Sequence, residues 1–113
     1  MMRILIIEDE PLVAKDLERQ LTQLQPDVSI VGVLPSIVSG RNWFAQHPMP
    51  DLIFSDIRLA DGISFELFES LKISCPVIFT TAYDEYALRA FKLNSIDYLL
   101  KPIDVNELSN ALH

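Results

Sequence analysis

The sequence contains little cysteine, little positive charge and no long hydrophobic segment. Its single cysteine, Cys75, cannot form an intrachain disulfide, and its place before Pro76 and an apolar run indicates a buried structural thiol rather than a reactive one. Lys and Arg number 9 and Asp and Glu 16, and the net charge of −7 opposes direct binding to nucleic acid. No apolar segment approaches the ~20 residues of a membrane span, and the run at residues 4–7 is too short for a signal peptide. We therefore expect a cytoplasmic protein that does not contact membranes.

The length and composition indicate one folded domain. The chain has 113 residues, of which 50% are hydrophobic, which is enough to bury a core. We find no internal linker, long repeat or low-complexity segment, so we assign residues 1–113 to a single domain. The chain stops about two turns into its last expected helix, at ~3.6 residues per turn. We therefore expect it to be a piece of a longer protein.

Short apolar runs alternate with helical patterns along the chain. Strands are expected at residues 4–7, 28–34, 52–54, 77–79 and 96–100. The runs at 4–7 and 77–79 are continuously apolar, as in parallel strands that are covered on both faces. Helical spacing is found in Leu12, Val13, Leu17, Leu21 and Leu24, then in Phe65, Phe68 and Leu71, in Ala87, Ala90 and Phe91, and in Leu108, Ala111 and Leu112. Asp104 and Glu107 resemble a capping box at the start of the last helix.

This alternation predicts an α/β fold in which helices cover both faces of a parallel sheet. Right-handed crossovers leave few possible arrangements. A common one for five strands is the doubly wound, flavodoxin-like (βα)5 sheet with strand order 2-1-3-4-5. Five prolines fall near the expected element boundaries, where a missing backbone donor does least harm: Pro26, Pro35, Pro48, Pro50 and Pro76.

Residues that can carry chemistry lie at the ends of four of the expected strands. They are Glu8 and Asp9 after the first, Asp56 at the end of the third, Thr80 and Thr81 at the end of the fourth, and Lys101 after the fifth. Because open α/β sheets bind ligands at the carboxyl ends of their strands, we expect Asp9 and Asp56 to face each other. Each residue also has an ordinary explanation as a helix cap, a turn residue, a strand residue or a surface lysine. Their joint occurrence at one sheet edge nevertheless indicates a site.

The composition of this cluster is that of a magnesium-dependent phosphoryl-transfer site. Carboxylates held close together resist joint ionisation, and a hard divalent cation removes the conflict. Mg²⁺ prefers a few carboxylates, several waters and a substrate phosphate. A carboxylate can also act as the nucleophile and form an aspartyl phosphate. Catalysis of that transfer consists mainly of positioning and charge neutralisation, which Mg²⁺, Lys101 and a threonine hydroxyl would supply.

Four motifs resemble those of the receiver domains of two-component response regulators. They are residues 6–11 (Ile-Ile-Glu-Asp-Glu-Pro), residues 56–62 (Asp-Ile-Arg-Leu-Ala-Asp-Gly), Thr81-Ala82, and residues 98–102 (Tyr-Leu-Leu-Lys-Pro). The resemblance covers essentially the whole chain. It implies a signalling domain that is phosphorylated on aspartate and is not an enzyme, beyond catalysing its own phosphorylation and dephosphorylation.

The resemblance also implies how the metal and the phosphoryl group are held. Asp56 is the expected phosphoacceptor and a Mg²⁺ ligand, and Asp9 is the expected direct ligand. Glu8, where the family more often has Asp, would contribute mainly through water. The backbone carbonyl of Arg58 would be a further ligand, whatever its side chain does. Lys101 is the expected active-site cation.

A conformational switch is implied by the same resemblance. Thr81 is preferred over Thr80 because Ala82 follows it, and its hydroxyl would turn toward the phosphoryl group. Tyr98 would then move inward as the aromatic switch residue. The peptide bond between Lys101 and Pro102 is expected to be cis.

The flanking sequences resemble receivers that are joined to LytTR-type DNA-binding domains. This likeness rests on residues 79–87 and 95–103. It implies that DNA is contacted only through a C-terminal output domain absent from this chain. Phosphorylation is expected to drive homodimerisation through helix four, strand five and helix five, where Tyr86, Arg89 and Lys92 would lie beside Tyr98. His47 and His113 are interpreted as surface residues, so the phosphoryl donor would be a sensor histidine kinase or a phosphotransfer protein.

Two side chains are expected to set how long the phosphoryl group lasts. In the family that the chain resembles, the positions of Arg58 and Tyr83 flank the route of the attacking water. Both residues are large, and neither is a carboxylate or amide suited to orienting a nucleophile. We therefore predict slow self-dephosphorylation, although both side chains could also simply extend into solvent.

Three other functions are considered. A flavodoxin-like cofactor binder would need a Ser/Thr/Gly-rich phosphate loop after the first strand, where this chain has an acidic one. A haloacid-dehalogenase-type phosphatase would need a second Asp two residues after Asp9, where Pro11 stands. A dimerisation module that works without phosphorylation stays open. Trp43 is interpreted as a half-buried helix residue and not as a binding platform.

Overall fold

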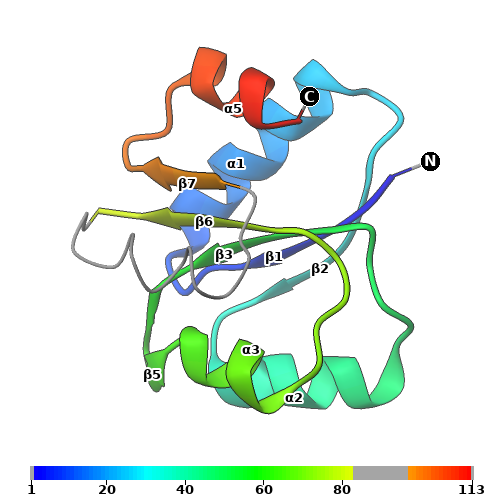
Figure 1. Cartoon of the computed structure of the whole chain (residues 1–113). Helices are drawn as coiled ribbons and strands as arrows, with labels where there is room; N and C mark the ends of the chain where they lie inside the picture. The colour runs from blue at the N-terminus through cyan, green and yellow to red at the C-terminus, as the bar shows by residue number, and fades with distance from the viewer. Residues whose placement is uncertain (1, 83–96, 113) are drawn as a thin grey trace.

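A five-stranded parallel sheet forms the centre of the molecule. The computed structural model describes residues 2–82 and 97–112. The strand order is β2-β1-β3-β6-β7, which is the flavodoxin-like order 2-1-3-4-5 that the sequence predicts (Figure 1). The strands of this sheet are β1 (Arg3–Ile7), β2 (Ser29–Leu34), β3 (Leu52–Asp56), β6 (Val77–Thr81) and β7 (Asp97–Leu100).

Helices cover both faces of the sheet. α1 and α5 lie on one face and α2 and α3 on the other (Figure 1). Their bounds are α1 (Pro11–Leu24), α2 (Ile37–Gln46), α3 (Phe65–Ser70) and α5 (Val105–Leu112). The helix expected around Ala87, Ala90 and Phe91 lies outside the described residues. Within residues 2–82 and 97–112, no helix is both long and apolar enough to span a membrane.

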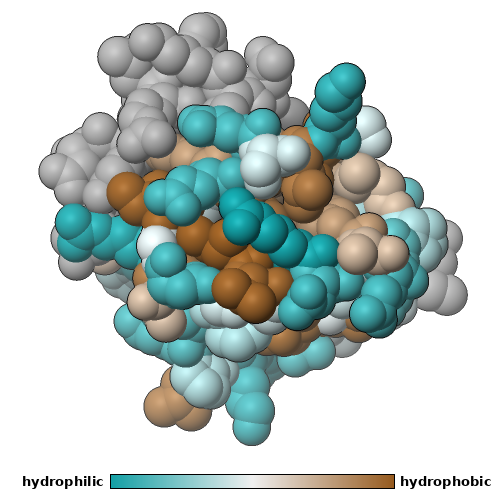
Figure 2. Space-filling view, turned by 90° about the horizontal axis from the view of Figure 1, so that it is seen from below, coloured by the Kyte–Doolittle hydropathy of each residue, from teal (hydrophilic) through white to brown (hydrophobic). Residues whose placement is uncertain are grey.

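Two hydrophobic cores, one on each side of the sheet, explain why β1 is continuously apolar. Ile4 and Ile6 pack against α1 and α5, whereas Leu5 and Ile7 pack on the α2–α3 side. All four side chains are fully buried, because alternate residues of a strand point to opposite faces. Seen from the α2–α3 side, the outer surface is largely hydrophilic, with smaller hydrophobic areas between (Figure 2).

The burial of three side chains adds to what the sequence indicates or corrects it. Leu12 belongs to the helical spacing of residues 12–24, but it is 81% exposed. The buried stripe of α1 includes Leu21, and Leu12 lies nine residues earlier, about two and a half turns, on the opposite side of the helix. Trp43 is buried rather than half-buried, and its indole lies close to Gly32 of β2. Cys75 is half-buried rather than buried, and burial raises the pKa of its thiol to about 11, as expected of an unreactive thiol.

The starts of the first and last helices agree with the sequence-based expectations. Pro11 is the first residue of α1, and the carboxylate of Asp104 accepts a hydrogen bond from the backbone N–H of Asn106 at the start of α5. His47 is exposed, as expected, and its ring stacks on Trp43 with ring centroids 4.5 Å apart.

A small antiparallel hairpin between β3 and α3 was not foreseen. It consists of β4 (Arg58–Leu59) and β5 (Gly62–Ile63), and Arg58 pairs with Ile63. Gly62 has a φ of 144°, a conformation that side-chain-bearing residues rarely adopt. The hairpin directly follows Asp56, and it therefore positions the backbone next to the candidate site.

Candidate functional site

Three carboxylates meet at the carboxyl ends of two neighbouring strands. Glu8 and Asp9 follow β1, and Asp56 is the last residue of β3. Carboxylate oxygens from the three residues all lie within 4.8 Å of one another. The pairing of β1 with β3 in the parallel sheet produces this proximity, as the strand order predicts.

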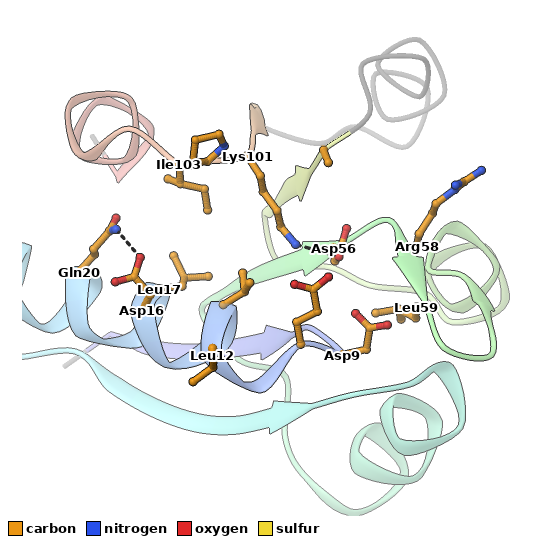
Figure 3. Close-up of a pocket in the computed structure, with 14 residues that line it drawn as sticks. Asp9, Leu12, Asp16, Leu17, Gln20, Asp56, Arg58, Leu59, Lys101 and Ile103 are labelled. Carbon is orange, nitrogen blue, oxygen red and sulfur yellow. Dashed lines mark hydrogen bonds and ion pairs between the residues drawn. The ribbon is translucent and has the colours of Figure 1, made fainter.

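Lys101 is the counterion of the two buried carboxylates of this cluster. Glu8 and Asp56 are 4% and 6% exposed. The Lys101 ammonium donates a hydrogen bond to Glu8 Oε1 at 2.5 Å. It donates another to Asp56 Oδ2 at 3.0 Å (Figure 3). The remaining oxygens of both carboxylates accept backbone hydrogen bonds, Glu8 Oε2 from Glu10 and Asp56 Oδ1 from Ile57. Glu8 and Asp56 are therefore held in position by Lys101 and by the backbone.

The electrostatics of the site are those of crowded, buried charges. The pKa of Glu8 is raised to about 7, mainly because burial disfavours its charged form. The hydrogen bond from Lys101 opposes this rise, and the Asp56 charge adds to it. Burial lowers the pKa of Lys101, but its hydrogen bonds to Glu8 and Asp56 raise it more, so that it lies above its ordinary value. Lys101 is thus charged at neutral pH, while Glu8 is close to taking up a proton.

The raised pKa of Glu8 predicts how stability depends on pH without divalent metal. The folded state holds a proton on Glu8 that the unfolded state releases near pH 4.5, so the free energy of unfolding should fall as pH rises from about 4.5 to 7. We expect Glu8→Gln to remove about 2 kcal/mol of this fall in the free energy of unfolding. Each pKa unit corresponds to about 1.4 kcal/mol, and we expect somewhat less than the value for the whole shift of the Glu8 pKa. Urea unfolding in EDTA between pH 5 and 8 measures it. The exposed neighbour variant Glu10→Gln should keep the wild-type slope, and equal slopes for all three proteins would contradict the assignment.

The candidate switch residues lie along the adjacent strands. Thr81 ends β6 and is fully buried, and its carbonyl accepts a hydrogen bond from the backbone N–H of Lys101 at 2.7 Å. Thr80 is also buried and pairs with Asp56. Tyr98 is half-buried in β7. The Lys101–Pro102 peptide bond is cis, as the resemblance to receiver domains implies.

A pocket opens beside the carboxylates, between α1 and the segment after β7. Its polar lining includes Asp9, Asp56 and Lys101, and its apolar lining includes Leu12 and Ile103. The Arg58 side chain is exposed and extends away from Asp56 (Figure 3). Tyr83, the other residue expected to set phosphoryl lifetime, lies outside the described residues.

The outward position of Leu12 on this pocket wall is a feature that the sequence analysis did not identify. Its spacing from the other leucines places it in the same helix, and the available signal was its position nine residues before the buried Leu21, on the opposite side of that helix.

The donor set fits a hard divalent cation. Glu8, Asp9 and Asp56 supply only oxygen ligands, and three carboxylates so close together carry more negative charge than Lys101 balances. Mg²⁺ is held by oxygen ligands and commonly by one or two carboxylates with substrate phosphate. Among residues 2–82 and 97–112, this is the group of acidic, histidine and cysteine residues compact enough to hold a metal ion.

Comparison with protein families decides the identity of the domain. The sequence pattern of the response regulator receiver domain matches residues 4–113. The chain belongs to the response regulator receiver family. Receiver domains bind Mg²⁺ at an acidic pocket and interact with histidine kinases or phosphotransfer proteins, and they are signalling modules rather than enzymes.

Curated relatives place this receiver domain near regulators named LytT and BtsR. It is 37% identical to the sensory transduction protein LytT of Enterococcus faecalis over 98% of this chain and 46% of that protein. It is 39% identical to the transcriptional regulatory protein BtsR of Escherichia coli over 99% of this chain and 47% of that protein. The chain therefore spans less than half the length of these relatives.

Solved structures of receiver domains share the fold. The response regulatory domain of mrkE from Klebsiella pneumoniae superposes with a TM-score of 0.87 at 30% identity, over 98% of this chain and 92% of that one. The non-phosphorylated HemR receiver domain of Leptospira biflexa gives 0.82 at 28% identity, over 99% of this chain and 90% of that one.

Proposed function

We propose that this receiver domain accepts a phosphoryl group on Asp56 from a phosphohistidine of a sensor kinase or phosphotransfer protein. An Asp56 carboxylate oxygen attacks phosphorus, the bond from phosphorus to the donor imidazole nitrogen breaks, and an aspartyl phosphate forms. The observation that carries the proposal is the Lys101 ammonium 3.0 Å from Asp56 Oδ2, beside Glu8 and Asp9. A cation there can neutralise charge on the transferring group.

The metal ligands in this proposal are Asp9, Asp56 and the backbone carbonyl of Arg58, with Glu8 contributing mainly through water. Glu8 is deeply buried and already bonded to Lys101, whereas Asp9 is more exposed and lines the pocket. When bound, Mg²⁺ would neutralise the carboxylates and the incoming phosphoryl oxygens. Lys101 holds Asp56 in place for attack, and the backbone N–H of Ile57 fixes its other oxygen.

Phosphorylation would be transmitted to output through Thr81 and Tyr98. The Thr81 hydroxyl would turn toward the phosphoryl group and Tyr98 would move inward, changing the surface of helix four, strand five and helix five. We propose that two phosphorylated copies pair through this surface. Its expected residues Tyr86, Arg89 and Lys92 lie outside the described residues. The similarity to a sensory transduction protein and to a transcriptional regulatory protein supports a role in transcription regulation for the whole protein. We propose that its output domain is a LytTR-type DNA-binding domain and that it acts in the cytoplasm.

Mg²⁺-dependent labelling by acetyl phosphate tests the proposed function. The purified domain is incubated with acetyl phosphate, with Mg²⁺ or with EDTA, and phosphorylation is followed by intact mass. We expect one phosphoryl group per chain with Mg²⁺ and none with EDTA. An unlabelled protein under both conditions would favour the alternative, a dimerisation module that works without phosphorylation.

The side chain at position 58 should affect how long the phosphoryl group lasts. Arginine cannot orient an attacking water as an amide can, and it could pair with phosphoryl oxygens and stabilise the ground state. We expect Arg58→Asn to speed the decay of the phosphorylated domain by about tenfold. This is below the ~10²–10⁴-fold typical of a positioned acid or base, because an amide can orient the attacking water but cannot take its proton. The decay is measured after removal of acetyl phosphate, with Mg²⁺ present. Arg41→Asn, a change of the same kind on α2, serves as the control, and an unchanged or slower decay for Arg58→Asn would overturn the role given to Arg58. A Tyr83→Glu variant tests the second expected position in the same assay.

A further inference from the structure

Asp61 joins the hairpin after the phosphorylation site to a helix far away in the sequence. It lies between β4 and β5, and its carboxylate accepts hydrogen bonds from the backbone N–H groups of Ile37 at 2.8 Å and Val38 at 3.1 Å. These are the first two residues of α2, whose N–H groups have no partner within the helix. The hydrogen bond from Ile37 holds the pKa of Asp61 below its ordinary value, so the carboxylate is charged at neutral pH.

The helix does not need Asp61 as its only cap. The Ser36 hydroxyl accepts from the backbone N–H of Ser39, and the Ser39 hydroxyl bonds back to the backbone N–H of Ser36. This reciprocal pair is a complete capping box at the start of α2. The two hydrogen bonds that Asp61 accepts have a different effect from those of Ser36, because they connect the hairpin to the helix.

The hairpin is too small to hold its own shape. Each of its strands has two residues, and even isolated two-stranded hairpins of greater length are only marginally stable. At its base the backbone N–H of Ser64 bonds to the carbonyl of Ile57. At its tip, Gly62 lies so close to α2 that a Cβ there would come 3.0 Å from Ile37 Cδ1. The hairpin tip thus contacts α2 in two ways, through the hydrogen bonds to Asp61 and through the close packing of Gly62 against Ile37.

We propose that Asp61 is a positioning residue for the metal site. A backbone carbonyl, unlike a side chain, cannot be re-aimed by choosing another rotamer, so its position depends wholly on the backbone that carries it. By fixing the hairpin tip on α2, Asp61 sets where the carbonyl of Arg58 lies relative to Asp9 and Asp56. The inference rests on the proposed function, in which that carbonyl is a Mg²⁺ ligand.

The test compares Asp61→Ala with Ser36→Ala, which removes a cap from the same helix without releasing the hairpin. The readout is the rise in Tm caused by Mg²⁺, measured at a concentration of about 100 times the wild-type Kd. A purely structural loss lowers Tm with and without Mg²⁺ alike and leaves the rise unchanged. Loss of an outer partner of a metal ligand weakens affinity by about tenfold or more. A tenfold weaker site keeps only about half of the Mg²⁺-induced stabilisation at that concentration.

We therefore expect about half the wild-type rise for Asp61→Ala and the full rise for Ser36→Ala. A full rise for Asp61→Ala, or an equal reduction in both variants, would overturn the positioning role. Asp61→Asn keeps one oxygen acceptor and should lie between Asp61→Ala and wild type; if the alanine variant does not fold, a full rise for Asp61→Asn overturns the inference. The proposed function is tested separately: Mg²⁺ should raise the Tm of the wild-type protein, and Asp9→Ala should remove this rise. If the wild-type protein shows no such rise, or if Asp9→Ala keeps it, the proposed function is wrong.

Discussion

Asp56→Asn is expected to abolish Mg²⁺-dependent labelling of the domain by acetyl phosphate. Asparagine has almost the same shape, and its amide oxygen can still accept the hydrogen bond from Ile57 that Asp56 Oδ1 accepts at 2.7 Å. The amide is not a nucleophile comparable to a carboxylate, so the covalent step is lost while the fold is kept. The signal should fall to that of the EDTA control, measured by intact mass.

Two variants separate loss of the nucleophile from other effects. Asp27→Asn makes the same chemical change at an exposed position and should label like wild type. Asp9→Ala should need much more Mg²⁺ for labelling, while its Tm without Mg²⁺ should hold or rise because one of three crowded carboxylates is gone. Full labelling of Asp56→Asn would show that Asp56 is not the phosphoacceptor.

Lys101→Met is expected to be the most destabilising single change at the site when no divalent metal is present. Methionine keeps most of the length and packing of the side chain but removes the ammonium that bonds Glu8 and Asp56. Breaking a buried ion pair by removing one partner costs about 3–5 kcal/mol. We expect about 3 kcal/mol at pH 8, at the low end, because the Lys101 side chain is 16% exposed and Glu8 can neutralise itself.

The pH and metal dependence of this loss distinguish charge from packing. Glu8 already has a pKa of about 7, and removing the Lys101 ammonium removes an influence that lowers it, so the carboxyl is protonated more readily. The loss measured by urea unfolding should therefore be smaller at pH 6 than at pH 8, and Mg²⁺ should recover part of it. Lys15→Met on the exposed side of α1 should change stability little at either pH. A loss that is the same at both pH values and with Mg²⁺ would point to packing instead.

Much of the fold could be predicted because its signals are local. A strand such as β1, apolar at every position, is compatible with burial on both faces, and this alone favours a parallel sheet between two layers of helices. Once the sheet order is known, the ends of its strands place Asp9 and Asp56 together without any knowledge of side-chain detail.

What the sequence does not reveal depends on contacts between distant residues. The exposure of Leu12 follows from the rotation of α1 on the sheet, which its leucine spacing alone leaves ambiguous. The hairpin tip and α2 are joined by Asp61 and Ile37, which lie 24 residues apart and share no sequence pattern. The raised pKa of Glu8 likewise arises from burial that is complete only in the folded molecule.

The bonds of Lys101 have a consequence for synthesis of the chain. Lys101 and Glu8 are separated by 93 residues, and Lys101 and Asp56 by 45. A nascent polypeptide can therefore expose its first three strands while the ammonium that joins their carboxylates is still inside the ribosome. Until the segment after β7 emerges, the ammonium cannot reach the Glu8 and Asp56 carboxylates. The two ion pairs of the site can therefore form only after translation has passed Lys101.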